Sequence, residues 1–193
     1  QSSSILVKDQ ATGEFVEHQR VEGSKMVWKD LDQIPINLRY AVISIEDERF
    51  EDHYGVDWKR TISAFANLVL HFSSQEYGGS TITQQLIKNI TGEDESSGIE
   101  GYARKVKEIF VATEMEKKYS KDQILEFYLN NIYYGNGYYG IGAAGSGYFD
   151  SEVGDLDLSQ IAFLCAVPNN PTVYDPVTHM DHAVERRERI LGK

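Results

Sequence analysis

Apolar side chains recur every three or four residues along most of the chain, a spacing typical of amphipathic α-helices. After Leu31 the pattern begins with Ile36, Tyr40 and Ile43, which would share one face of a helix that runs into an acidic stretch. The pattern therefore predicts a mainly α fold. Further helices are predicted over residues 58–72, 81–89, 102–118, 120–131, 158–167 and 181–191.

Two of these helices begin with a capping-box sequence, in which a hydroxyl residue is followed three residues later by Gln. Thr81 with Gln84 and Ser120 with Gln123 fit this pattern. Residues 91–101 are predicted to form a surface loop, and no helix is predicted over the glycine-rich residues 135–147.

Residues 4–18 show a different pattern, in which apolar and polar residues alternate on either side of Thr12-Gly13. Alternation around such a pair predicts a short β-hairpin. We expect a single domain over residues 1–193, in which residues 1–27 form the hairpin and a lead-in and residues 28–193 form the helical part.

The 193-residue chain carries a formal net charge of −11. Broad nucleic-acid binding needs many Lys and Arg side chains on phosphates, so this charge argues against it. The longest apolar run, residues 161–167, is too short to span a bilayer. It contains Cys165, the single cysteine, which we predict to be a buried thiol and not a nucleophile. The chain starts at Gln1 without Met or a signal sequence, which indicates a cut end.

Two motifs suggest ligands but lack the context that such ligands need. Residues 135–140 fit G-x-G-x-x-G, yet they follow a predicted helix and no alternating β/α pattern surrounds them, so we reject a dinucleotide site. His179 and His182 have metal-ligand spacing, but no cysteine or third ligand accompanies them. We interpret them as solvent-exposed histidines and assign no metal site.

Two polar segments carry candidate chemistry in the first half of the chain. Glu46 directly follows the apolar residues 41–45, and a partly desolvated carboxylate at a helix end is suited to act as a general base; the alternative is a solvated acidic cap. Gly78-Gly79 precedes a predicted helix whose first N–H groups are free to bind an anion. Gln84 and Lys88 lie four residues apart and so share one face of this helix. A Gly-Gly turn before a capped helix is also common without a ligand.

Two further segments lie on the strongest predicted helices. Arg104 and Lys105 lie about one helical turn before Glu108. They could form a simple ion pair with it, or a basic cluster that binds phosphate oxygens. Glu126 and Asn130 share one face of the next helix, where we interpret them as support for the site.

Taken in order, these segments resemble glycosyltransferase family 51, the peptidoglycan glycosyltransferase domain of class A penicillin-binding proteins and monofunctional transglycosylases. A late block with Pro168, Pro171, Tyr174-Asp175-Pro176 and Arg186-Arg187 is also similar. The resemblance covers residues 31–191. Its main motifs are E-D-x-x-F-x-x-H-x-G at 46–55, G-G-S-T-I-T-Q-Q at 78–85, R-K-x-x-E at 104–108 and K-x-x-x-x-E-x-Y-L-N at 121–130.

The resemblance implies a lysozyme-like, two-lobed fold with a head and a jaw near the membrane. It implies polymerisation of lipid II into β-1,4-linked glycan strands by an inverting mechanism, with release of undecaprenyl diphosphate and inhibition by moenomycin. No cofactor is required by the sequence, although a divalent cation, Mg²⁺ or Mn²⁺, is compatible with the family. The partners implied are lipid II, the growing glycan chain, the membrane and other cell-wall synthesis proteins. The location implied is the extracytoplasmic face of a bacterial membrane, with an N-terminal transmembrane anchor outside this chain.

By the same resemblance, Glu46 is the general base and Glu108 is a second essential carboxylate that organises the basic residues or a cation. Membrane contact is expected from residues 68–77, for which burial in the core is the alternative. The substrate-binding residues implied are Asp47, Arg49, Phe50, His53, Gly79, Ser80, Thr81, Gln84, Gln85, Lys88, Asn89, Arg104, Lys105, Glu126 and Asn130.

One position departs from the family pattern. Many members carry an Arg where this chain has Ser63, and Lys59 or Arg60 could supply that charge instead. Two other readings stay open at this point: a lysozyme-like hydrolase or lytic transglycosylase, and a non-catalytic module that binds lipid II. The basic cluster speaks against a hydrolase, because hydrolysis of a glycan releases no diphosphate.

Overall fold

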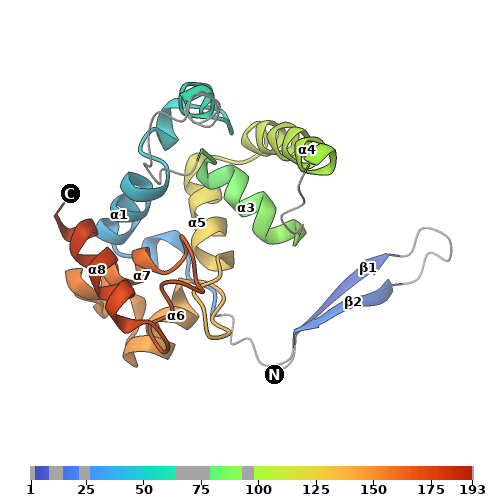
Figure 1. Cartoon of the computed structure of the whole chain (residues 1–193). Helices are drawn as coiled ribbons and strands as arrows, with labels where there is room; N and C mark the ends of the chain where they lie inside the picture. Colours follow the sequence, from blue (N-terminus) through green and yellow to red (C-terminus); the bar gives the residue numbers. More distant parts are fainter. Residues whose placement is uncertain (1–2, 9–14, 22–26, 64–78, 93–97, 193) are drawn as a thin grey trace.

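The computed structural model describes residues 3–8, 15–21, 27–63, 79–92 and 98–192, and this part of the chain is mainly helical, as predicted (Figure 1). Strands β1 (Ser3–Lys8) and β2 (Phe15–Val21) pair antiparallel, with a register shift between Ile5 and Leu6. The longer helices are α1 (Ile36–Glu46), α3 (Ile82–Thr91), α4 (Gly98–Glu116), α5 (Lys121–Asn131), α6 (Ile141–Phe149), α7 (Leu158–Ala166) and α8 (Met180–Leu191). Three single-turn 3-10 helices are described at Leu31–Gln33, Phe50–Asp52 and Val153–Asp155.

Capping boxes set the starts of three helices. The Thr81 and Ser120 boxes predicted from the sequence are confirmed at the starts of α3 and α5, and Asp157 with Gln160 forms a third box at α7. Each box satisfies backbone N–H groups that the first helical turn leaves without a partner. The starts of these helices are therefore set by local sequence.

Helix α5 lies at the centre of the helical assembly, packed against α3 on one side and α6 on the other (Figure 1). Its buried residues join a core that also includes residues of α1, α3, α6 and α7. Helix α7 is buried along most of its length, including Cys165, and burial together with the charge of Glu46 raises the pKa of this thiol to about 12. The prediction of an inert buried thiol is confirmed.

Two boundaries differ from the sequence predictions. Helix α4 begins at Gly98, so part of the predicted 91–101 loop is helical. Helix α6 occupies residues for which no helix was predicted, because its glycines suggested irregular chain. These glycines serve close packing instead: a Cβ on Gly142 would lie 2.3 Å from the Val27 carbonyl oxygen, and one on Gly147 would lie 2.3 Å from the Tyr138 ring.

Some predictions fall on residues outside the described ranges. They are the hairpin turn at Thr12-Gly13, the expected membrane contact at residues 68–77, and the second half of the predicted 58–72 helix, of which residues 58–63 are helical. Across the described ranges, helices that combine the length and the hydropathy needed to cross a bilayer are absent.

Candidate active site

Glu46 is the last residue of α1, and its two carboxylate oxygens have different surroundings. Oε2 accepts a hydrogen bond of 3.0 Å from the Gln85 side-chain amide on α3. Oε1 is buried and has no hydrogen-bond partner among the described residues. A buried carboxylate oxygen without a partner is uncommon in folded proteins.

Asp47, the next residue, fixes the end of α1 against the start of α3. Its side chain is fully buried, and Oδ2 accepts the backbone N–H of Ile82 at 2.9 Å. Since Ile82 is the first residue of α3, the carboxylate also lies at the positive end of that helix. The same oxygen lies 2.9 Å from Nε2 of His53. This arrangement places Glu46 and Gln85 on two helix ends that are tied together.

Behind Asp47, a buried polar network supports the 47–53 loop. Lys121 bonds the carboxylate of Glu116 at 2.6 Å and the carbonyl oxygen of His53 at 2.7 Å, and its ammonium lies 4.4 Å from the centre of the Phe50 ring. Thr83 donates to the other Glu116 oxygen at 2.6 Å. The predicted residues Asp47, Phe50 and His53 therefore lie together behind Glu46.

Arg49 and Asp57 close the other side of this loop. The guanidinium binds the carboxylate in two-point fashion, with Nε to Oδ2 and Nη2 to Oδ1 both at 2.9 Å. Asp57 also accepts the Arg60 backbone N–H at 3.0 Å and so caps the helix that begins at residue 58. Burial opposes ionisation of Asp57, but these hydrogen bonds outweigh it and lower the pKa of the carboxyl.

We expect Asp57→Asn to lower the melting temperature at neutral pH by roughly 2–4 °C, a loss of about 1 kcal/mol. Asparagine keeps the helix cap but loses the charge that binds Arg49. Because the folded-state pKa lies below the ordinary value of 3.8, the ionised carboxylate stabilises the protein above about pH 4 and less as pH falls through the folded-state pKa. Thermal melts from pH 7 to pH 3 should show the difference shrinking on acidification; a constant difference would contradict this assignment.

The departure from the family pattern at Ser63 has a structural counterpart in Arg60. The Ser63 hydroxyl donates to the Lys59 carbonyl oxygen within its own helix, on the exposed surface. Arg60 reaches back to the site, where Nη1 donates to the backbone carbonyl oxygen of Glu46 at 2.6 Å and lies 3.9 Å from Asp47 Oδ1. Of the two replacements considered, Arg60 is the one brought to the end of α1.

A basic cluster lies on α4, which packs against α3. Arg104 Nη1 lies 3.4 Å from Glu108 Oε2, and Lys105 Nζ binds the other oxygen, Oε1. Lys105 also donates to the Ser80 hydroxyl at 2.8 Å, which links α4 to the residues just before α3. Lys88 lines a small pocket with Arg104 and Glu108 between the two helices. The structure thus brings the predicted basic residues and the second carboxylate together.

Thr81 and Gln84 serve the start of α3. Thr81 Oγ1 donates to the carbonyl oxygen of Gly55 at 2.7 Å and accepts from the Gln84 backbone, while Gln84 Oε1 accepts the Thr81 N–H at 3.0 Å. Both side chains are fully buried. The structure therefore places these two predicted substrate-binding residues in the helix cap.

Four other predicted residues have no hydrogen bond to Glu46 among the described contacts. Glu126 Oε2 accepts the Leu31 N–H at 2.8 Å, and Asn130 exchanges two hydrogen bonds of 2.8 Å with the Lys29 backbone, so both hold the 29–31 segment on α5. Asn89 is exposed near the end of α3. Gly79 precedes the α3 cap and is half-buried.

Several residues of the site were missed by sequence reasoning. Tyr128 donates to Gln85 Oε1 at 3.0 Å, and Glu116 and Lys121 form the network behind His53. Tyr128 and Lys121 belong to the K-x-x-x-x-E-x-Y-L-N motif, which was the available signal for them. Glu116 carried no such signal.

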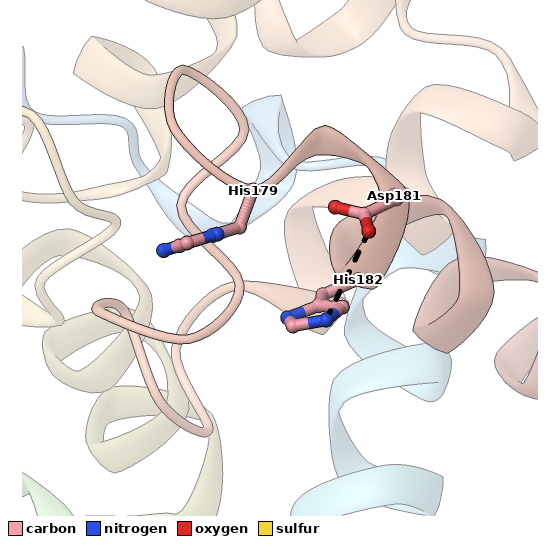
Figure 2. Close-up of side chains that lie close together, drawn as sticks. All are labelled: His179, Asp181 and His182. Carbon is pink, nitrogen blue, oxygen red and sulfur yellow. Dashed lines mark ion pairs between the residues drawn. The ribbon is translucent and has the colours of Figure 1, made fainter.

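The two rejected motifs have structural explanations. Gly135, Gly137 and Gly140 all have positive φ and form a tight turn between α5 and α6. His179 and His182 are exposed at the start of α8, as predicted, but Asp181 lies with them, so that ligand atoms of the three side chains come within 4.8 Å of one another (Figure 2). The ion pair between His182 and Asp181 measures 3.9 Å. The prediction that no third ligand accompanies the histidines is therefore wrong, because Asp181 lies with them. All three side chains are exposed, as predicted for the two histidines.

The described residues place a partly buried glutamate at the end of α1, bonded to α3, and a basic cluster on α4, which also packs against α3. The chain matches the Transglycosylase family over residues 12–193, and it belongs to that family.

Similar proteins carry penicillin-binding protein names. Penicillin-binding protein 1F of Bacillus subtilis is 45% identical over 162 residues, which are 84% of this chain and 22% of that protein. Penicillin-binding protein 1A of Mycolicibacterium smegmatis is 40% identical over 191 residues, 99% of this chain and 24% of the relative. Penicillin-binding protein 1A of Clostridium perfringens (strain 13 / Type A) is 43% identical over 193 residues, 98% of this chain and 27% of the relative.

The chain therefore spans about a quarter of the length of the curated relatives it matches. Family membership and these relatives support a peptidoglycan glycosyltransferase function in cell-wall synthesis, as predicted.

Proposed function

We propose that this domain polymerises lipid II and that Glu46 is the general base. The observation that carries the proposal is the asymmetry of the Glu46 carboxylate, in which Oε2 is held by Gln85 while buried Oε1 has no partner among the described residues. An oxygen without a donor keeps a lone pair that can accept the proton of a sugar hydroxyl.

The proposed reaction is one inverting displacement. The acceptor's 4-hydroxyl gives its proton to Glu46 as its oxygen bonds to the anomeric carbon of the donor. The bond between that carbon and the phosphate oxygen breaks, and the diphosphate leaves with the electron pair. Gln85, Asp47 and Arg60 hold Glu46 in place through its side chain, the adjacent carboxylate and its backbone carbonyl.

The basic cluster of Arg104 and Lys105 binds the leaving diphosphate in this mechanism. Lys105 is about one-third exposed and Arg104 less so, which lets both contact a ligand from the surface. Positive groups already in position stabilise charge that develops on the leaving oxygen. Both oxygens of Glu108 bind these cations, so we assign Glu108 the role of organising them and assign it no metal ion.

The substrates are lipid-borne, and we propose that this domain works at the extracytoplasmic face of the membrane, within a longer membrane-anchored protein. Helix α4 supplies a contact surface in the described part of the chain. Tyr102, Val106 and Phe110 are spaced four residues apart and are 71%, 67% and 67% exposed. Side chains at this spacing share one helix face, and a row of exposed apolar groups is suited to a bilayer surface.

We expect the double substitution Val106→Ser/Phe110→Ser to reduce flotation with phosphatidylglycerol–phosphatidylethanolamine liposomes at least tenfold. Burying one such side chain contributes about 1.5–3 kcal/mol. Val177→Ser is the matched control, since Val177 is 72% exposed but lies outside α4. Equal flotation of the double variant and the control, or no flotation of the wild type, would contradict membrane contact through α4.

Polymerisation of labelled lipid II by the purified protein tests the proposed function directly. We expect glycan chains to form and moenomycin to abolish them. Release of soluble fragments from purified sacculi without lipid II would instead indicate a hydrolase.

A further inference from the structure

We propose that Tyr128 is a positioning residue for the general base, acting through Gln85 to fix which oxygen of Glu46 receives the acceptor's proton. The inference rests on the proposed function and adds a residue on α5 to the site. Its basis is a chain of two hydrogen bonds that crosses three helices. The Tyr128 hydroxyl donates to Gln85 Oε1 at 3.0 Å, and Gln85 Nε2 donates to Glu46 Oε2 at 3.0 Å.

The first link concerns the Gln85 amide, whose oxygen and nitrogen have opposite hydrogen-bonding roles. If the amide were turned over, its oxygen would face the Glu46 carboxylate, and two acceptors would meet. In the observed orientation each end has the right partner, because Tyr128 donates to the oxygen and Glu46 accepts from the nitrogen. Without the hydroxyl, the amide oxygen loses this donor and only one of the two bonds that orient the group remains.

The second link concerns the rigidity and protonation of Tyr128. Its side chain is 1% exposed and belongs to the main core, so the ring cannot move without disturbing α5. Burial, together with the nearby charge of Glu46, raises the pKa of Tyr128 well above its ordinary value of 10. The hydroxyl therefore remains protonated, and a donor, throughout the pH range in which the enzyme works.

The third link is the choice between the two oxygens of Glu46. Gln85 occupies Oε2, whereas buried Oε1 has no partner among the described residues. The Tyr128–Gln85 pair thus orients the carboxylate so that Oε1 is the oxygen left without a donor, and we infer that it is the one that takes the acceptor's proton. A general base works only when its lone pair points at the proton it removes, and small errors in this geometry slow the reaction strongly.

Tyr128→Phe tests the proposal, because it keeps the buried ring and removes only the donor. We expect the kcat for lipid II polymerisation to fall roughly 10- to 100-fold, with KM within about twofold because the substrate does not touch Tyr128.

A double-mutant cycle separates positioning from a general effect on folding. In a Gln85→Met background the chain of bonds is already broken, so adding Tyr128→Phe should change kcat by less than about twofold. The matched control is Tyr134→Phe, which removes a hydroxyl from another fully buried tyrosine near Glu46 and should leave kcat unchanged. Melting temperatures of all variants identify any loss that comes from unfolding.

The outcomes distinguish this inference from the proposed function. If the wild type polymerises lipid II and Glu46→Gln does not, the proposed function stands. If Tyr128→Phe then matches the wild type in kcat, or if its effect is fully retained in the Gln85→Met background, the positioning role is overturned. An inactive wild type under membrane-like conditions overturns the proposed function itself.

Discussion

Replacement of Glu46 by Gln should reduce the kcat for lipid II polymerisation by about 10³-fold or more. General-base catalysis typically contributes about 10²–10⁴-fold to the rate. Glutamine has nearly the same shape but cannot take up the acceptor's proton. Its amide would also present either a second donor to Gln85 Nε2 or a nitrogen where the free oxygen now lies. Single-turnover polymerisation with fluorescent lipid II, separated by gel, measures the loss without interference from product release.

Glu48→Gln is the matched control for this experiment. Glu48 is two residues away, carries the same charge and is exposed, so its replacement should leave kcat within about twofold of the wild type if its effect is only a change in net charge. Substrate binding by Glu46→Gln should persist, because the groups proposed to hold the diphosphate lie on α4 and α3. A Glu46→Gln protein that polymerises at the wild-type rate would show that another group removes the proton.

Replacement of Lys105 by Gln should have the second largest effect, a fall in kcat of about 10²–10³-fold. The Lys105 ammonium lies between Ser80 and Glu108, at the junction of α4 with the start of α3. There we expect it to stabilise the negative charge that develops on the leaving phosphate oxygen. A neutral amide keeps hydrogen-bonding ability but lacks the positive charge. Because the side chain is about one-third exposed, we expect only a small change in melting temperature.

The control for the charge is Lys118→Gln, which removes an exposed lysine just after the end of α4. This variant should polymerise lipid II at the wild-type rate. Comparing the two at low and high salt separates a local contact from the general field of the protein, since exposed charges more than about 8–10 Å apart are screened at physiological ionic strength. Equal losses in both variants would contradict a specific role for Lys105.

The glycine-rich segment shows where local reading of the sequence fails. Isolated glycines lower helix propensity, so residues 135–147 gave no reason to predict a helix. Helix α6 nevertheless forms there, and its Gly142 and Gly147 face the Val27 backbone and the Tyr138 ring, where a larger residue would not fit. Tertiary packing thus outweighs local propensity, and one of these neighbours, Val27, lies far away in the sequence.

The capping boxes at Thr81 and Ser120 show the opposite case. Each depends on residues three positions apart, so its hydrogen bonds can be predicted from the sequence and are present in the structure. The same holds for the cluster of Arg104, Lys105 and Glu108, whose members lie within one turn of a single helix. The buried state of Cys165 likewise follows from an apolar run around it.

The sequence by itself determined the helical class, the capped starts of α3 and α5, the basic cluster and the candidate base, because each depends on near neighbours or on a motif. Only the tertiary structure decided how these parts meet. Glu46 and Gln85 are 39 residues apart, Gln85 and Tyr128 are 43 apart, and Glu126 binds a backbone group 95 residues away. Helical periodicity indicates which face of each helix is buried, but it does not state which side chain of another helix that face will meet. The partners of Glu46 are therefore set by the packing of α1, α3 and α5.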